Sequence, residues 1–357
     1  MHREPFKDFR HGQRLRSIIR ALSEHPGESV PQASENASES QSIYRFWANK
    51  RVSAPQILAS HRFSVVDRAN AEAVVLAIQD TTDLDFTSLS QTSGLGLINQ
   101  TNQQGIKVHS CLAVSGAGEP LGLLHQHTWN RQERAGKRGE RRKKATCDKE
   151  SQRWLDTVKA AEVGIDPSIC LVHVGDREAD IYDLFVQPRQ VGSELLIRVE
   201  HNRKVQHELG YLIPTLEQAP GMGQQTIEVE RNPERPARQA TLRLRGMQVT
   251  LEVPRHHKHR KPCQPVRLNF LLVEETTPPT EGKPIRWLLL TTLPMEDFEQ
   301  AWQYVRWYAL RWLIERFHFT LRHWVSDGTA SARNCPAIAQ RPCHLLDCGL
   351  ALDVAHL

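Results

Sequence analysis

Residues 74–82 read Val-Val-Leu-Ala-Ile-Gln-Asp-Thr-Thr, an apolar run that ends on the aspartate at position 80. A second run, at 169–174, leads into Gly175 and Asp176. Unbroken apolar runs of this length are typical of strands that are buried on both faces of a sheet. The sequence therefore predicts a central sheet in which the two most buried strands each deliver an aspartate at the carboxyl end.

The flanking sequence supplies the other elements of this sheet. Further strands are expected at 106–114, 119–126 and 195–199, and helices at 149–162 and 179–186. Residues 199–292 alternate apolar and polar positions between turns, which is typical of half-buried antiparallel strands. A long helix is expected over 296–324. This order predicts a mixed α/β sheet flanked by helices, with an antiparallel β insertion before the last helix.

The composition excludes several classes of protein. The chain has 357 residues, of which 39% are hydrophobic, enough for a folded core. It has no apolar stretch near the ~20 residues of a membrane helix and no secretory signal, so a cytoplasmic, nucleoid-associated protein is expected. The seven cysteines include no Cys-x-x-Cys pair, which argues against a disulfide framework and a zinc knuckle.

Basic residues are concentrated in two runs, although the net charge is only +5. Eight of them lie between Arg131 and Lys144, including Arg142 and Lys143, and residues 255–261 form a second run of Arg, His and Lys. Such runs lie in solvent, where phosphate is the usual counter-charge. Together they favour DNA as a partner over two solvated loops, and over a zinc site at the three histidines of the second run.

Four polar side chains recur late in the chain at helical spacing. Tyr308, Arg311, Glu315 and Arg322 are three, four and seven residues apart. At about 100° per residue they share a stripe roughly 60° wide on a continuous helix. A solvated face with salt bridges is the ordinary interpretation of such a stripe. The tyrosine fits that interpretation poorly, so we expect a functional face.

These motifs together resemble a known family. Asp80-Thr81-Thr82 after one buried strand, residues 175–181 (Gly-Asp-Arg-Glu-Ala-Asp-Ile) after another, and the Tyr-x2-Arg-x3-Glu-x6-basic spacing are similar to the IS-four family of DDE transposases of bacterial insertion sequences. The resemblance extends from about residue 8 to 325. It implies a ribonuclease H-like core at 69–198 and 293–325, a β-strand insertion at 199–292 and an N-terminal helical DNA-binding region at 1–68.

The resemblance also implies the catalytic residues. The metal-binding triad falls on Asp80, Asp176 and Glu315, which would hold two Mg²⁺ ions, or Mn²⁺ in their place, for DNA cleavage, hairpin formation and strand transfer. Carboxylate oxygens are the hard ligands that such ions require, and three clustered carboxylates repel one another without cations. The phosphate-binding residues fall on Tyr308, Arg311 and Arg322, where arginine stands in place of the family's lysine.

Further DNA contacts follow by position. Trp287 corresponds to a tryptophan that receives a flipped base, although a core tryptophan on a strand fits the sequence equally well. Arg198 corresponds to a DNA-contacting arginine. Candidate contacts to DNA ends and backbone are Arg10, Arg14, Arg142 and Lys143. The implied partners are double-stranded DNA, as terminal inverted repeats and as target, and, if the C-terminal region were intact, a second subunit in a paired-end homodimer.

The resemblance ends after Val325. Residues 326–357 hold three of the seven cysteines and lack an amphipathic pattern, where the family continues with helices that support dimer formation. One hypothesis is a frameshift shortly after Val325, and the rival is a zinc site at Cys335, Cys343, His344 and Cys348. A copy without its dimerisation region would be a DNA-binding remnant or an inhibitor of transposition.

Overall fold

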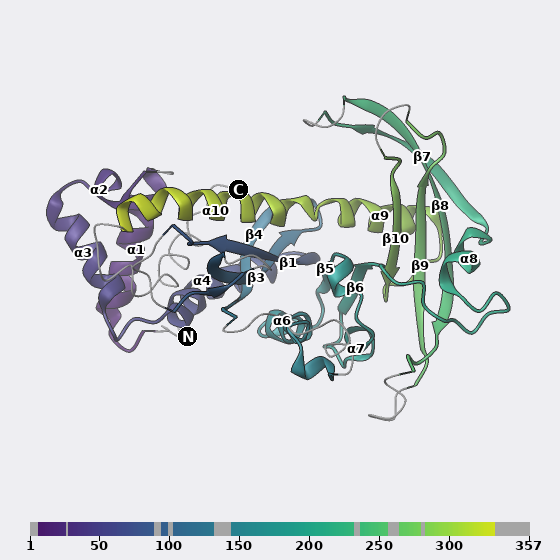
Figure 1. Ribbon diagram of the computed structural model, residues 1–357, viewed down its shortest axis with the longest axis horizontal. Helices are drawn as coiled ribbons and strands as arrows, with labels where there is room; N and C mark the ends of the chain where they lie inside the picture. The colour runs from purple at the N-terminus through teal and green to yellow at the C-terminus, as the bar shows by residue number, and fades with distance from the viewer. Residues whose placement is uncertain are drawn as a thin grey trace. The chain divides into compact units, whose positions relative to one another are not determined.

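The computed structural model describes residues 6–25, 28–88, 94–98, 103–131, 144–231, 236–255, 264–279 and 283–332, with side chains up to residue 323. It is a mixed α/β fold with mixed strand pairing and N-terminal helices, as the sequence predicts (Figure 1). The chain divides into two compact units. The first comprises Met1–Arg141, Lys159–Ile169 and Trp312–Leu357, and the second comprises Arg142–Val158 and Cys170–Arg311.

The N-terminal helices are α1 (Phe9–Glu24), α2 (Val30–Ala33), α3 (Ala37–Ala48) and α4 (Ala54–Ala69). Asp8 begins α1 by accepting a hydrogen bond from the Arg10 backbone N–H at 3.0 Å, which satisfies one of the unpaired donors of a first helical turn. The first three helices share one apolar core, formed by Phe6, Leu15, Ile18, Leu22, Val30, Ala33, Ile43, Phe46, Trp47, Val52 and Ile57. In α1 the buried residues Leu15, Ile18 and Leu22 recur every three or four residues, so one face of the helix contributes to this core.

The strands of the first unit are β1 (Val74–Asp85), β2 (Gly96–Leu97), β3 (Gln104–Ser115) and β4 (Pro120–Trp129). β3 pairs antiparallel with each of the other three. Arg62 and Arg68 of α4 donate hydrogen bonds to backbone carbonyls of β4, so α4 covers that strand. Helix α10 (Trp312–Ala332) packs against β1.

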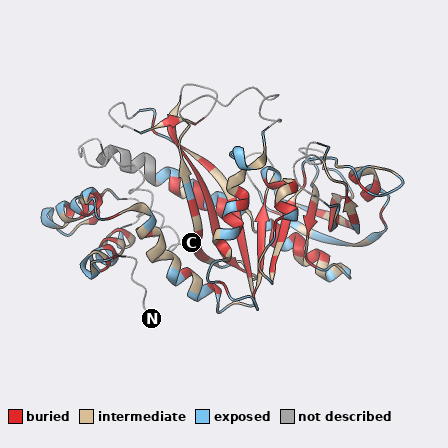
Figure 2. Cartoon of the chain, turned by 90° about the horizontal axis from the view of Figure 1, so that it is seen from below, coloured by how far each residue is buried: buried red, intermediate tan, exposed pale blue. Residues whose placement is uncertain are grey.

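β1 continues past the point where the sequence predicted its end. Asp80 lies inside the strand and is paired in register with Ser110 of β3. The strand is buried on both faces as far as Gln79, and beyond it Thr82 and Leu84 are buried while their neighbours are not. Figure 2 shows that buried residues predominate along the long strands. The first polar residues of β1 therefore mark the point where the strand changes from being buried on both faces to being buried on one. A strand that is covered on one face alternates buried and more exposed residues.

The second unit begins with η1 (Thr146–Asp148) and the part of α6 (Gln152–Glu162) up to Val158. It contains one mixed sheet in the order β5-β6-β10-β9-β8-β7. β5 and β6 are parallel, and the other neighbours are antiparallel. The strands are β5 (Cys170–Gly175), β6 (Ser193–Arg198), β7 (Gly221–Val229), β8 (Arg238–Leu251), β9 (Val266–Glu275) and β10 (Arg286–Thr291). Because β10 pairs with β6, the strands of 199–292 continue the sheet that β6 belongs to.

Several elements of the second unit differ in extent from the expectation. Much of the alternation in the middle of 199–292 belongs to a single long strand, β8. The helix expected at 179–186 is divided into η2 (Arg177–Ala179) and α7 (Tyr182–Val186). The alternating segment also contains a short helix, α8 (Leu212–Glu217), which its pattern did not predict.

The long helix expected over 296–324 is two helices. α9 (Phe298–Ala309) ends at a turn formed by Leu310 and Arg311, and α10 then runs beyond the predicted stop at 326–328. The predicted stripe is therefore divided between two helices, with Tyr308 on α9 and Glu315 and Arg322 on α10.

None of the described helices is long and apolar enough to cross a membrane.

Candidate active site

Asp80 is the predicted site residue on β1. Its Oδ1 accepts a hydrogen bond from the Thr81 backbone N–H at 2.8 Å, and its side chain is 21% exposed. The Nδ1 atom of His318, on α10, lies 4.0 Å from Asp80 Oδ2. The carboxylate is thus held by its own strand and faced by an imidazole from the helix that carries Glu315.

His318 is a residue that the sequence did not single out. It is 3% exposed, and its Nε2 lies 3.1 Å from Ser110 Oγ, the register partner of Asp80. Gln126 of β4 donates a hydrogen bond to the same hydroxyl at 3.1 Å. The two ring nitrogens of His318 thus face the Ser110 hydroxyl and the Asp80 carboxylate.

The sequence signal for His318 was weak. The residue lies three positions after Glu315 on the face of α10 that also carries Ile314, Phe317 and Leu321, all fully buried. A histidine on an apolar helix face is usually a satisfied core residue. Its contacts come from β1 and β3, which lie some two hundred residues away in sequence, so helical spacing alone could not reveal them.

Glu315 and Arg322 are exposed on the same face of α10, two turns apart. Arg322 Nη1 donates a hydrogen bond to Thr82 Oγ1 at 3.2 Å, and Thr82 is two residues from Asp80 on β1. α10 is therefore joined to β1 by two contacts, one on Asp80 and one on Thr82. The first unit in this way places Asp80, Glu315 and Arg322 on two elements that pack together.

Asp176 belongs to the second unit and follows β5 directly, as predicted. Its Oδ1 accepts a hydrogen bond from the Glu178 backbone N–H at 2.9 Å and so caps the short helix η2. An aspartate directly after a strand commonly caps the helix or turn that follows. The cap holds the carboxylate in place at the end of a buried strand.

Tyr308 is the centre of a group of predicted residues in the second unit. The tyrosine is 3% exposed, and burial raises the pKa of its hydroxyl. The positive charges of Arg311 and Arg198 act in the opposite direction on this pKa, Asp176 raises it, and Arg198 donates a hydrogen bond to the hydroxyl. The phenol is thus neutral and surrounded by two arginines and a carboxylate.

Trp287 of β10 joins this group. Its ring centroid lies 5.3 Å from that of Tyr308 with the two planes at 67°, an edge-to-face contact. The indole is partly exposed rather than buried in the core. The second unit therefore brings together five of the residues that the sequence predicts for the site. They are Asp176 after β5, Arg198 of β6, Trp287 of β10, Tyr308 of α9 and Arg311 just after α9.

The predicted DNA contacts of the N-terminal region lie on α1. Arg10 is exposed and forms an ion pair with Asp8 at 2.8 Å, and this hydrogen bonding lowers the pKa of Asp8 to about 2. Arg14 is also exposed and donates a hydrogen bond to Ser42 Oγ of α3 at 3.1 Å. Arg142 and Lys143, and most of the second basic run, lie outside the described residues.

In the described part of the chain no three His, Cys, Asp or Glu side chains gather as a metal site requires. Asp80 and Glu315 belong to the first unit and Asp176 to the second. All three are carboxylates, the ligand type that Mg²⁺ and Mn²⁺ prefer, so the donor chemistry fits these ions. The cysteines and the histidine considered for zinc after position 333 lie outside the described residues.

One comparison with known proteins bears on this arrangement. Residues 2–52 match the family model described as Transposase DNA-binding. The matched range contains α1, α2 and α3 with their common core, and it includes Arg10 and Arg14. The match supports a transposase with DNA as a partner of its N-terminal helices.

Proposed function

We propose that this protein is a DDE transposase that cuts DNA at the ends of an insertion sequence and joins the cut ends to target DNA. The observation that carries the proposal is the match of residues 2–52 to transposase DNA-binding domains. Carboxylates of the required kind follow it in the chain: Asp80 on β1, Asp176 after β5 and Glu315 on α10. A ribonuclease H-like core and membership of the IS-four family are parts of the same proposal.

In this proposal Asp80, Asp176 and Glu315 hold two Mg²⁺ ions, or Mn²⁺ in their place. When bound, such ions activate the attacking oxygen and stabilise the leaving oxygen of a phosphodiester. Three clustered carboxylates repel one another in the absence of cations. Protonation of any one of them would remove a ligand for the metal ions. The cap on Asp176 and the contacts of Asp80 hold the side chains in position before any cation arrives.

The other residues of the site bind DNA. Arg198, Arg311 and the neutral phenol of Tyr308 provide donors for phosphate oxygens, and Arg322 provides them from α10. The partly exposed ring of Trp287 is available for stacking with an extruded base. The reaction then consists of attack by water on a transposon end, attack by the freed 3′-hydroxyl on the opposite strand to form a hairpin, reopening of that hairpin, and joining to target DNA.

The N-terminal helices bind the terminal repeats, and two copies of the chain hold the paired ends as a homodimer. Arg10 and Arg14 contribute backbone contacts, because guanidinium groups on an exposed helix face suit phosphate recognition. This part of the proposal places the protein with DNA in the cytoplasm.

The test is cleavage of a supercoiled plasmid that carries the inverted repeats flanking this gene, with Mg²⁺ and then Mn²⁺. We expect end-specific nicking by the wild type, and a loss of at least about 1,000-fold in Asp80→Asn, Asp176→Asn and Glu315→Gln. Glu119→Gln, in the turn before β4, is the matched control and should cleave normally.

Tight binding of the repeats without cleavage in either metal would contradict the proposal and favour the DNA-binding remnant. Cleavage that does not depend on the repeat sequence would instead point to a nuclease.

A further inference from the structure

α10 carries an aromatic and basic stripe that the proposed chemistry does not use. Trp312, Arg316, Phe319 and His323 recur every three or four residues, and all four are exposed. The Trp312 and Phe319 side chains are 55% and 53% exposed. Large aromatic side chains are usually buried, so two on one face of one helix indicate an interaction surface.

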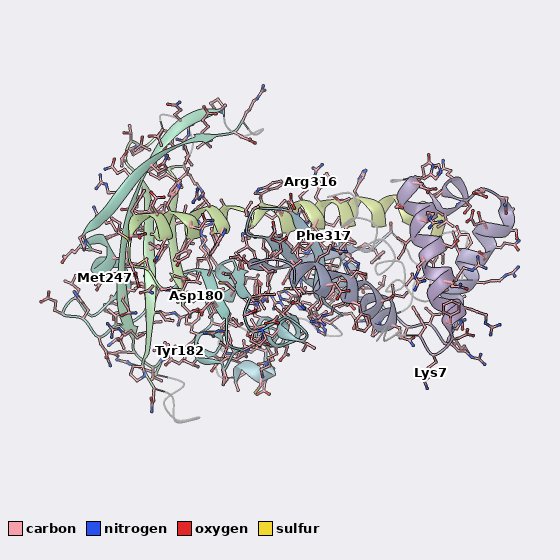
Figure 3. All side chains as sticks on the ribbon, turned by 180° about the vertical axis from the view of Figure 1, so that it is seen from behind. Lys7, Asp180, Tyr182, Met247, Arg316 and Phe317 are labelled. Atoms are coloured by element: carbon pink, nitrogen blue, oxygen red, sulfur yellow. The ribbon has the colours of Figure 1, made fainter. Side chains whose placement is uncertain are left out.

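The opposite face of α10 is a well-packed core face. Ile314, Phe317 and Leu321 are fully buried, and Leu313 is 6% exposed. Figure 3 shows Arg316 and the neighbouring Phe317 extending from opposite sides of the helix. The exposed rings are therefore not core residues of a loosely packed helix, because the helix already has a complete buried face.

One exposed ring of the stripe, that of Phe319, contacts its neighbours on the stripe. The Arg316 guanidinium lies 5.4 Å from the centroid of the Phe319 ring, and the centroid of the His323 ring lies 6.3 Å from it with an interplanar angle of 10°. Such contacts restrict the rotamers of an exposed side chain. A surface that is ordered before binding loses less entropy when a ligand arrives.

The charges identify the class of ligand. Between Trp312 and His323 the exposed basic residues are Arg316, Arg322 and His323, against a single acid, Glu315. The core of a protein interface is depleted in charged residues, whereas proteins that bind single strands alternate aromatic rings for bases with cations for phosphates. The bases of duplex DNA are covered by their own stacking, so only unpaired nucleotides can use these rings.

We propose that the stripe Trp312, Arg316, Phe319 and His323 is a stacking platform for unpaired DNA nucleotides on the helix that carries Glu315. The inference rests on the proposed function only in taking DNA as the ligand. Trp312 and Phe319 stack on bases, and Arg316 binds the adjoining phosphate. Because Glu315 lies on the same exposed side of α10, nucleotides on the platform would lie next to that carboxylate.

The test is fluorescence anisotropy of the full chain with labelled oligo(dT) and with a duplex of equal length, in EDTA so that no cleavage occurs. We expect Trp312→Ala with Phe319→Ala to weaken oligo(dT) binding about tenfold or more, and duplex binding less than about twofold. Trp312→Tyr with Phe319→Tyr keeps the rings and should bind oligo(dT) nearly as the wild type does.

Phe63→Ala is the matched control, because Phe63 is 44% exposed on α4 and lies off the stripe. Circular dichroism of each variant checks the fold. Unchanged oligo(dT) binding in the double alanine variant would overturn the proposal. The proposal would also be overturned if the double alanine variant were monomeric and the wild type were not, since the stripe would then be a contact between copies of the chain. If the variant loses oligo(dT) binding but the wild type never cleaves DNA, the platform stands and the proposed function fails.

Discussion

At the scale of single residues, His318 is the side chain that most directly affects Asp80. Its Nε2 contacts Ser110 at 3.1 Å while its Nδ1 faces the Asp80 carboxylate at 4.0 Å. Partners of a metal-ligating carboxylate orient it, and their loss commonly costs about 10- to 100-fold in metal affinity or activity. An asparagine at this position places an amide nitrogen near Nδ1, whereas a glutamine places it near Nε2.

We therefore expect His318→Gln to raise the Mn²⁺ concentration for half-maximal cleavage about tenfold or more, and His318→Asn to raise it much less. The second measurement is the rise in unfolding temperature caused by Mn²⁺ without DNA, which should shrink in the same order. His173→Gln is the control, since this buried histidine makes a comparable contact with Ser193 at 3.1 Å. Equal metal responses in the two His318 variants would show that His318 only fills space.

At the scale of elements, Asp180 joins the segment after β6 to the turn between η2 and α7. Its side chain is fully buried and accepts hydrogen bonds from Glu200 N, His201 N and His201 Nδ1 at 2.9, 2.8 and 3.0 Å. Arg203 pairs with the same carboxylate through Nε at 3.0 Å. Burial opposes its charged form, but these donors and the Arg203 charge outweigh that effect and lower the pKa of Asp180.

Asp180→Asn should destabilise the fold by about 3 kcal/mol, because it leaves the largely covered Arg203 guanidinium without its anion. The pKa of Asp180 is lower in the folded than in the unfolded chain, so its stabilising effect is present above about pH 4 and is lost as the pH falls below that value. Thermal unfolding between pH 7 and pH 3 measures both effects. Glu208→Gln, exposed in the same segment, should change neither, and a wild-type pH profile in Asp180→Asn would contradict this account.

The sequence predicted those elements whose signal is local. β5 is found within one residue of its predicted start because an unbroken apolar run has one ordinary explanation. The division between α9 and α10 carries no such signal, because Ala309, Leu310 and Arg311 are all good helix formers.

The residues of the candidate site likewise divide into those that the sequence could predict and those that it could not. The sequence could select Asp80, Asp176 and Glu315 from their positions after apolar runs and on a helix. It could not find Ser110 or Gln126 as neighbours of His318, because the pairing of β1, β3 and β4 decides which polar side chains meet beneath Asp80.

At the scale of the whole molecule, a net charge of +5 is too small to specify a DNA-binding protein, so the placement of charge must do so. The helices that match transposase DNA-binding domains carry Arg10 and Arg14 on the exposed side of α1. Each cation that contacts a phosphate releases a counterion, which contributes about −0.9 to the slope of log affinity against log salt. The total charge of the chain does not enter that slope.

Arg10→Gln with Arg14→Gln should therefore make the salt slope for duplex binding shallower by up to about 2, and should weaken binding alike on specific and unrelated sequences. Arg231→Gln removes the same charge from an exposed position outside the matched helices and should leave the slope unchanged. Affinities measured by anisotropy over a series of salt concentrations give both slopes. An equal reduction in the two variants would mean that overall charge governs the interaction. A change confined to α1 would show that the N-terminal helices bind the DNA backbone through these two arginines.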